Sequence, residues 1–459
     1  MKTNGGKMRT IIAVLVGAAL VAGGAVCTKA ASKGSAWTRW GITKPTTARG
    51  AEAKLADAYR LLYALKLDSA LAEYRDVVRR FPQSAEAHLG LSIVYRYSGR
   101  RDTALTEARA AYGLDSEATG VLLNYADLIL PIRTGDVPGM TAAERYAESE
   151  RCNLKAAAST HPLGVHAHTG LWAGYMAQGR LSDARHQALE LGRKQYYPQP
   201  LLDLAYNLLV GLEPKAILFT NGDNDTYPPW VLQQASDPFR PDVTVANLSL
   251  LNIPADVKMM RDSLSLPVSF SDEEIAALAP KPGPDGKSVL PSQQVVENII
   301  ANAPKSGRPV YFAVTVGKDM TGPYADRLVL EGLVNRVAEG KRSAAVDLDR
   351  LTQNLTKNYH LDWPAELPPW PQNMSPLTRM VAPLALNYAA AFVQMASLDD
   401  SLGRKDEAAA AWSEAVDWIV RGGSAAVARD YVNAWLARDP VNAVAQRLKA
   451  RLERAGAAR

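Results

Sequence analysis

The hydrophobic pattern divides the chain into three parts. From about residue 51 to 198, apolar residues recur every three or four positions in segments of helix length, which is typical of amphipathic helices. From about 214, short continuous apolar runs follow one another, separated by helix-length segments. From about 385 the helical spacing returns. We therefore expect an α + α/β protein with an N-terminal helical part, a central α/β domain and C-terminal helical hairpins.

The central apolar runs indicate a mainly parallel sheet. They are AILFT (216–220), DVTVANLSLL (242–251), PVSFS (267–271) and PVYFAVTV (309–316). Uninterrupted apolar strands that alternate with helices are typical of a parallel sheet covered on both faces, as in Rossmann-like domains. We assign this α/β domain to residues 200–345.

The first helical part contains an internal period of about 34 residues. Its third set of markers is displaced further along the chain, which predicts an inserted loop at PIRTGDVPGMT (131–141). The markers are small residues, aromatic residues and prolines at matching offsets, namely Ala70, Tyr74 and Pro82, then Tyr95, Ala104, Ala108 and Ser116, then Pro162, Tyr175 and Ala184.

This pattern resembles the tetratricopeptide repeat over residues 51–198, and GRRDTA (99–104) and GRLSDA (179–184) resemble each other as turns between paired helices. The resemblance implies a helical solenoid whose repeats bury their apolar faces by stacking. Such a solenoid forms a groove that binds a protein partner. The alternative is an ordinary helical core without a binding role.

Three predicted strands end in polar clusters. NGDNDT (221–226) follows the first strand, NLSLLN (247–252) closes the second, and TVGKD (315–319) closes a later one. The carboxyl ends of parallel strands share one edge of the sheet, and ligands bind beyond that edge. The candidate ligand-binding residues are Asn221, Gly222, Asp223, Asn224, Asp225, Thr226, Asn247, Ser249, Asn252, Lys318 and Glu331.

Two of these residues form a candidate metal site. Asp223 and Asp225 are separated by one residue, a spacing at which two carboxylates can share Mg²⁺ or Mn²⁺ through oxygen ligands. The alternative is a tight turn, because Asn, Gly and Asp tolerate left-handed backbone angles and Asp225 or Thr226 can cap the following helix. Glu331 lies among apolar neighbours, where a salt bridge is the simplest expectation.

The string AILFTNGDNDTYPPWVLQQASDPFRPDVTVANLSLLN, followed by RPVYFAVTV and LVLEGLVNRV, resembles the soluble C-terminal region of bacterial many-span membrane proteins related to protein O-mannosyltransferases, similar to vertebrate transmembrane protein 260. The resemblance covers roughly residues 200–345. It implies a link to cell-envelope glycosylation, with glycosyl transfer expected in a multi-span membrane part. Beyond residue 26 this chain has no apolar run as long as a membrane-spanning helix requires.

Residues 1–30 are expected to form a signal peptide or a membrane anchor. Basic residues precede an apolar stretch from Ile11 to Val26, and small residues follow it. The main part of the chain is therefore expected in a bacterial periplasm, free or anchored at the inner membrane. Four of the five net positive charges lie in this segment, so the remainder carries about +1 and no nucleic-acid partner is indicated.

Pro and Trp are concentrated in residues 346–384, which predicts a linker between domains. Residues 385–459 then show paired helical segments, in which GRKDEA (403–408) resembles the turns of the repeats. These helices are expected to pack on the central domain or to bind a partner.

Two functional hypotheses follow. The first, which we favour, is a non-catalytic, exported or membrane-anchored scaffold that binds a protein partner through the repeat groove and assists cell-envelope glycosylation or polysaccharide assembly; a membrane glycosyltransferase or a glycan is the candidate partner. The second is a divalent-metal-dependent glycosyltransferase-like enzyme or a sugar-binding module that uses the GDNDT motif (222–226).

Overall fold

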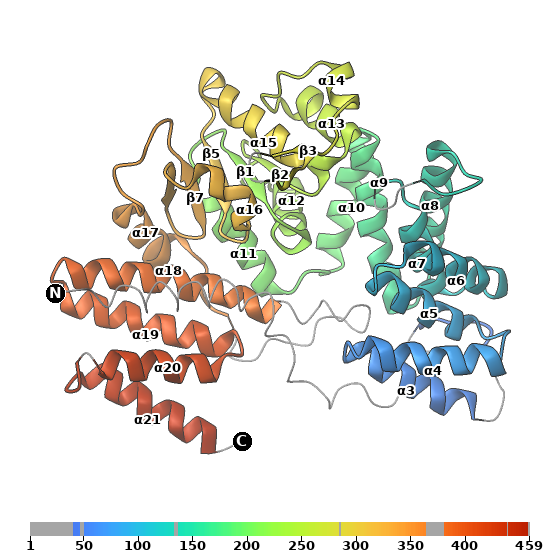
Figure 1. Ribbon diagram of the computed structural model, residues 1–459, viewed down its shortest axis with the longest axis horizontal. Coiled ribbons are helices and arrows are strands. Elements are labelled where there is room, and N and C mark those ends of the chain that lie inside the picture. The colour runs from blue at the N-terminus through green and yellow to red at the C-terminus, as the bar shows by residue number, and fades with distance from the viewer. Residues whose placement is uncertain are drawn as a thin grey trace.

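The computed structural model describes residues 40–45, 50–132, 136–283, 286–363, 381–437 and 439–457. The predicted signal peptide or anchor (1–30) lies outside the described residues, as do residues 364–380 of the predicted linker. Figure 1 shows the α/β unit between two helical arrays, so that the three parts form an arch. The predicted fold class is confirmed.

The first array consists of four helix pairs. A 3₁₀ turn, η1 (Pro162–His166), precedes the last pair. The inserted loop predicted at 131–141 lies between the two helices of the third pair, as expected. The helices are α3 (Ala51–Tyr63) and α4 (Leu67–Arg80), α5 (Ala85–Tyr97) and α6 (Arg101–Leu114), α7 (Thr119–Ile129) and α8 (Ala142–Ala157), and α9 (Ala167–Ala177) and α10 (Leu181–Arg193).

The markers of the repeat period occupy the contacts between helices. Ala70, Tyr74 and Ala104 are completely buried. A methyl group at Gly90 would overlap the ring of Tyr74, so α4 and α5 approach closely only because position 90 lacks a side chain. The small and aromatic residues of the pattern therefore set the spacing of the stacked repeats.

The turn between paired helices needs a left-handed residue. Gly99 (φ 74°) and Gly179 (φ 68°) supply it in the second and fourth pairs. In the first pair the equivalent position, one repeat before Gly99, is occupied by Leu65 with φ 56°. A side chain with a Cβ is strained in this conformation, whereas glycine is not.

The central sheet has five strands in the order β2 (Thr244–Asn247), β1 (Ile217–Thr220), β5 (Val310–Ala313), β7 (Val334–Val337), β6 (Leu328–Leu330). β2, β1 and β5 are parallel, as predicted, whereas β7 runs antiparallel to both β5 and β6. The antiparallel hairpin was not predicted. It turns at Gly332 (φ 128°), where a Cβ would overlap the hydroxyl of Tyr359.

The run PVSFS (267–271) does not form a strand. It passes between helices, and the backbone N–H of Ser269 donates to the side chain of Asn298 at 2.8 Å instead of to a neighbouring strand. A short, separate ribbon is formed by β3 (Lys281–Pro282) and β4 (Ser288–Val289).

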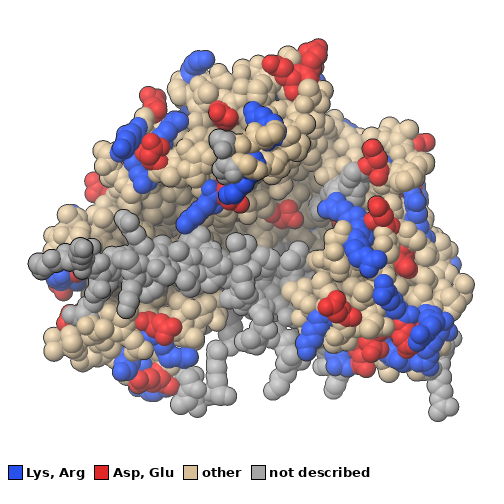
Figure 2. Space-filling view, viewed as in Figure 1, with Lys and Arg blue, Asp and Glu red and all other residues tan. Residues whose placement is uncertain are grey.

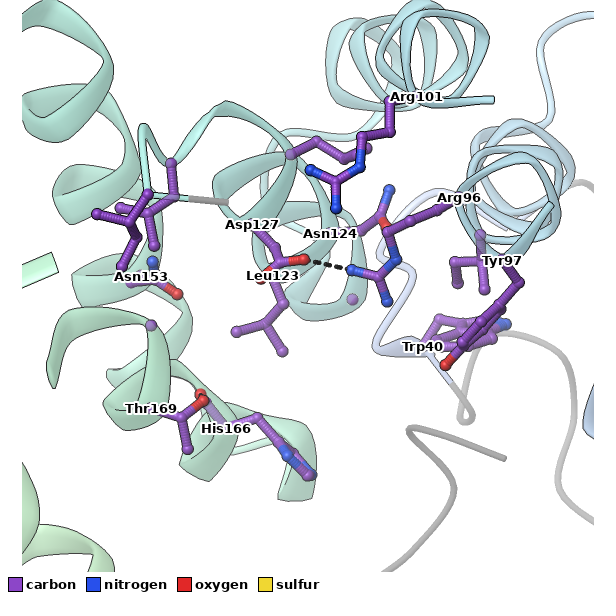
Figure 3. Close-up of a pocket in the computed structure, with 16 residues that line it drawn as sticks. Trp40, Arg96, Tyr97, Arg101, Leu123, Asn124, Asp127, Asn153, His166 and Thr169 are labelled. Carbon is purple, nitrogen blue, oxygen red and sulfur yellow. Dashed lines mark hydrogen bonds and ion pairs between the residues drawn. The ribbon is translucent and has the colours of Figure 1, made fainter. Parts of the chain in front are cut away.

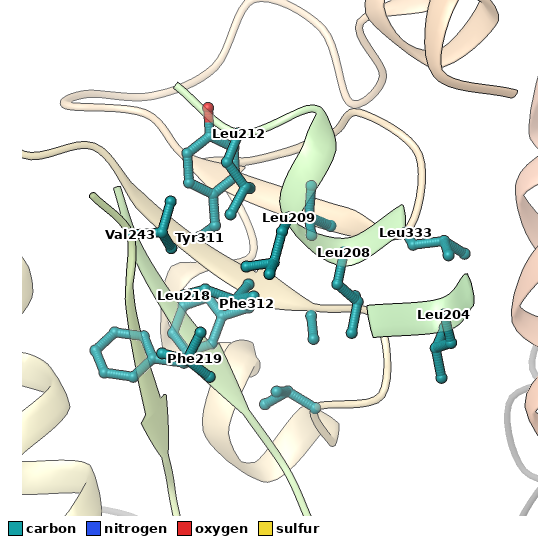
Figure 4. Packing of buried hydrophobic residues seen from close by; sticks show 14 of the residues in the cluster. Leu204, Leu208, Leu209, Leu212, Leu218, Phe219, Val243, Tyr311, Phe312 and Leu333 are labelled. Atoms are coloured by element: carbon teal, nitrogen blue, oxygen red, sulfur yellow. The ribbon is translucent and has the colours of Figure 1, made fainter. Parts of the chain in front are cut away.

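Helices cover both faces of the sheet. Figure 4 shows one face, where Leu204, Leu208 and Leu209 of α11 pack toward Leu218 and Phe312. The helices of the unit are α11 (Gln199–Val210), α12 (Tyr227–Gln234), α13 (Pro254–Leu264), α14 (Asp272–Ala276), α15 (Pro291–Asn302), α16 (Lys318–Thr321) and α17 (Leu348–Gln353), with the short turns η2 (Asp223–Asp225), η3 (Leu250–Asn252), η4 (Ala303–Ser306), η5 (Gly322–Tyr324) and η6 (Asn354–Asn358).

The segment after 345 belongs to the α/β unit up to residue 363, which corrects the predicted start of the linker. Val346 forms a parallel β-bridge with Leu330, and the hydroxyl of Tyr359 accepts a hydrogen bond from the backbone N–H of Leu333. Trp363 is buried rather than part of an exposed connection. The C-terminal helices are α18 (Val381–Ser401), α19 (Lys405–Arg421), α20 (Ala425–Leu436) and α21 (Ala443–Ala457).

Aromatic residues join the last repeat helices, the α/β unit and the C-terminal helices into one core, separate from the core of the earlier repeats. Trp172 of α9 lies 5.3 Å from Tyr227 and 5.4 Å from Trp230 of α12, measured between ring centroids. At the other end, Trp363 of the α/β unit lies 5.4 Å from Tyr388 of α18, measured between ring centroids. Such pairs add stabilisation beyond the apolar area that they bury.

One buried carboxyl lies where the α/β unit packs on the repeats. Asp256 is 1% exposed on α13, which packs on α9, and neither of its oxygens has a hydrogen-bond partner among the described residues. Burial raises the pKa of Asp256 to about 7. The neighbouring Tyr146 of α8 has a pKa raised to about 12, first by its own burial and then by the charge of Asp256.

We expect Leu65→Gly to raise the free energy of unfolding by about 0.5 to 1 kcal/mol, because it removes left-handed strain from an exposed turn. The reciprocal change Gly99→Ala, which places a side chain at a φ of 74°, should lower it by about 1 to 2 kcal/mol. Urea unfolding of the two variants and the wild type tests both. Destabilisation by Leu65→Gly would contradict the strain argument.

Asp256→Asn should change the pH dependence of stability. The folded-state pKa lies above the ordinary value, so the contribution of Asp256 to stability is complete below about pH 4 and is lost as pH rises toward 7. The variant lacks this loss, and its advantage over the wild type should approach about 4 kcal/mol above pH 7, since a pKa shift of one unit corresponds to about 1.4 kcal/mol. Asp430→Asn, at an exposed site on α20, is the control. Equal pH profiles for wild type and Asp256→Asn would refute the assignment.

Candidate functional site

The three polar segments predicted at the carboxyl edge of the sheet do meet there. β1 and β2 are in register up to Thr220 and Asn247, and β5 lies on the other side of β1. The GDNDT turn therefore has the end of a parallel strand on each side.

Asp225 is buried at this edge of the sheet and accepts hydrogen bonds that hold the turn in place. Its Oδ1 accepts the backbone N–H of Gly222 at 2.8 Å, and its Oδ2 accepts that of Asn221 at 2.9 Å. The hydroxyl of Thr315, beyond β5, also donates to Oδ2. The side chain is 3% exposed, and burial raises its pKa although these donors act to lower it. The carboxylate thus closes the turn and ties it to β5.

A second set of hydrogen bonds ties the turn to β2. The hydroxyls of Thr220 and Thr226 are 2.6 Å apart, and the Nδ2 of Asn247 donates to Thr226 at 2.8 Å. The Oδ1 of Asn247 accepts the backbone N–H groups of Ser249 and Leu250. All three of the side chains at 220, 226 and 247 are buried. The polar atoms of these side chains form hydrogen bonds within the protein.

The two aspartates of the candidate metal pair have different surroundings. Asp223 is exposed, whereas both oxygens of Asp225 are occupied by donors. A cation bound between them would have to displace those donors. The described part of the chain contains no group of three or more His, Cys, Asp or Glu side chains arranged to hold a metal ion.

The side chains of the other predicted site residues lie outside this network. Asn224 is half-buried on the turn, and Ser249 is exposed after β2. The Oδ1 of Asn252 accepts the backbone N–H of Ser292 at 3.0 Å, which makes it a link to α15. Lys318 is exposed at the start of α16.

Glu331 forms the expected salt bridge, in the hairpin beyond β5. Its Oε1 accepts Nε of Arg336 at 2.6 Å, while Oε2 is buried without a partner among the described residues. Burial raises the pKa of Glu331, and Arg336 opposes this shift.

A cavity of about 510 Å³ lies in the groove of the repeat array. Figure 3 shows Arg96 and Arg101 pointing into it from one side, and Asn153, His166 and Thr169 lying opposite. α5, α7 and α9, the first helices of their pairs, contribute much of the lining. Trp40, which precedes the repeats, lies at one end of the cavity.

Some polar groups of this groove lack a hydrogen-bond or ion-pair partner among the described residues. Arg96 forms an ion pair with Asp127, but no ion pair or hydrogen bond of Arg101 is found within the described residues. Asn124 is 6% exposed; its Nδ2 donates to Ser92, and its Oδ1 has no described partner. The guanidinium of Arg101 is therefore available to a bound segment.

His166 contributes a neutral ring to the groove. Its Nδ1 lies 2.9 Å from the hydroxyl of Tyr196, and burial lowers its pKa to about 4. Sequence reasoning did not identify these groove residues. The one signal was Asn124, a polar residue within the apolar run VLLNYADLI (121–129).

Charge on the visible face of the array is mixed. Figure 2 shows Lys and Arg interspersed with Asp and Glu over the repeat helices on the face in view. Among the described residues, no helix has both the length and the apolar character needed to cross a membrane.

Comparison with known proteins supports the assignment of the central unit. Residues 201–279 match the family model described as TMEM260-associated domain 2, which confirms the predicted resemblance over that part. No curated protein matches the chain.

Among solved structures, PilF of Pseudomonas aeruginosa is similar at 19% identity, covering 50% of this chain and 87% of PilF with a TM-score of 0.30. The tetratricopeptide domain of P58(IPK) is similar at 12% identity, covering 88% of this chain and 97% of that domain with a TM-score of 0.21. A chain of the Naa15/Naa10 complex bound to HypK-THB is similar at 11% identity, covering 88% of this chain and 60% of that one with a TM-score of 0.23.

Asp225→Asn should lower the free energy of unfolding by about 2 to 3 kcal/mol, because an amide cannot accept all the hydrogen bonds that both carboxylate oxygens receive. Asp223→Asn, on the same turn but exposed, should change it by less than about 0.5 kcal/mol. Thermal and urea unfolding measure both. Equal stability of the two variants would contradict the structural role of Asp225.

Proposed function

We propose that this protein is an exported or membrane-anchored scaffold of the bacterial cell envelope. Its repeat groove binds an extended segment of a protein partner. The α/β unit attaches the assembly to the proteins that carry out envelope glycosylation or polysaccharide synthesis. A membrane glycosyltransferase is the favoured partner.

The observation that carries this proposal is the groove itself. Within the described residues, Arg101 offers a cation without an ion pair at the wall of a cavity of about 510 Å³, which is also lined by Tyr97, His166 and Thr169. The cation favours a segment with acidic side chains.

The link to the envelope is supported by two features of the sequence. Residues 201–279 match a domain named for its association with TMEM260, and residues 1–30 have the composition of an export signal or anchor. The geometry of the GDNDT turn favours the scaffold over a metal-dependent enzyme or a sugar-binding module, because Asp225 is committed to the turn and only Asp223 faces solvent.

Site-specific photo-cross-linking in the producing cell tests the proposal. A photoreactive amino acid replaces Tyr97 in the groove or, as the control, Leu154, which is 49% exposed on α8. We expect an envelope protein to be captured from position 97 and not from 154.

The captured partner is then purified, and its affinity is measured by calorimetry. Arg101→Glu should weaken binding at least tenfold, about 1.4 kcal/mol, whereas Arg447→Glu on α21 should have no effect. Capture at both positions alike, or equal affinity of both variants, would reject the groove as the binding site.

A further inference from the structure

A second cavity, of about 680 Å³, lies at the opposite, amino edge of the sheet. Helix α10 of the repeat array forms one wall through Leu181 and Arg185, and the α/β unit forms the other through Lys215, Trp230 and Arg308. Its volume is in the range of small-molecule sites. We refer to it as the amino-edge cleft.

Arg308 lies half-buried in this cleft. Its Nε donates to the carbonyl of Lys215 at 2.9 Å, Nη1 donates to the carbonyl of Ser265 at 2.8 Å, and Nη2 donates to the hydroxyl of Thr244 at 2.5 Å. All three acceptors are uncharged, and no ion pair of Arg308 is present in the described part of the chain. A guanidinium has five N–H donors, so one N–H on each Nη stays free for a ligand.

The backbone around Arg308 is held in unusual conformations. Lys215 (φ 59°) and Ser265 (φ 52°) are both left-handed without being glycine. Each such residue costs about 1 kcal/mol or more, and strain of this kind concentrates at functional sites. The N–H of Lys215 donates to Asp242 at 2.9 Å while its carbonyl accepts from Arg308. The strained backbone therefore fixes the position from which the Lys215 side chain extends.

The charge of the cleft is not balanced. Three basic side chains line it, namely those of Arg185, Lys215 and Arg308, and within the described ranges no ion pair joins any of them to an acidic residue. The acidic residue of the lining, Asp242, pairs through both oxygens with Arg240, which holds its pKa at about 2. Its charge is thus already compensated.

We propose that the amino-edge cleft binds a small molecule that carries a phosphate or diphosphate group. Two free Nη donors of Arg308 match two oxygens of one phosphate, which is the geometry that makes arginine the preferred phosphate ligand. Lys215 and Arg185 add charge from the two walls, and the half-buried Leu181 gives apolar surface to the organic part. The site is separate from the repeat groove and does not depend on the function proposed for it.

The first experiment is calorimetric titration of the full chain with inorganic pyrophosphate at constant ionic strength. We expect binding by the wild type and at least a tenfold rise in Kd for the double variant Arg185→Gln, Lys215→Gly. Glycine is suited to the left-handed backbone at 215 and Arg185 is exposed on α10, so this variant should fold with undiminished stability. Thermal unfolding verifies this.

Two matched controls accompany it. Arg447→Gln removes an exposed charge from α21, and Arg101→Glu alters only the repeat groove; both should bind pyrophosphate as the wild type does. A parallel titration with phosphatidylcholine vesicles, with and without phosphatidic acid, separates a lipid-borne phosphate from a soluble one. Loss of binding to either probe in the double variant, but in neither control variant, supports the cleft as the binding site. No binding of either probe by the wild type, or equal binding by wild type and double variant, overturns it.

Discussion

The contact between Trp172 and the aromatic pair Tyr227 and Trp230 determines how the molecule is assembled. It joins the last repeat helices to the first helix after β1, with centroid separations of 5.3 and 5.4 Å. Because aromatic rings bury large areas and pack in few orientations, this contact fixes the array on the sheet. The amino-edge cleft exists only because α10 is held against that edge.

The same stretch of chain explains the GDNDT turn. Asp225 accepts hydrogen bonds from the backbone of residues 221 and 222 and so closes the turn. Tyr227 and Trp230, which come next in the sequence, form the aromatic contact. Asp225 also receives the hydroxyl of Thr315 from the end of β5. The polar residues of the motif therefore align the ends of β1 and β5, and the aromatic residues that follow hold the repeat array against the α/β unit. Such a motif has a physical reason to be polar and aromatic without any ligand.

The repeats and the polar edge were predictable because both depend on local spacing. Small and aromatic residues that recur once per repeat define helix pairs, and parallel strands bring their carboxyl ends together whatever their order. The full surroundings of each carboxylate were not predictable, since Asp225 accepts a hydrogen bond from Thr315, which lies far away in the sequence, in addition to those from its own turn. The β6–β7 hairpin likewise depends on Tyr359 filling the space beside Gly332, a contact that no local pattern encodes.

The two candidate binding regions share one helix pair. Thr169 and Gly170 of α9 line the repeat groove, while Leu181 and Arg185 of α10 line the amino-edge cleft. Since Trp172 holds this pair on α12, both regions are formed before any ligand arrives, and less of the binding energy is spent on ordering the protein. Communication between them would require α9 to adopt two positions, each favoured by one ligand. The dense aromatic packing around Trp172, which is completely buried, opposes such a shift and favours two independent sites on one rigid frame.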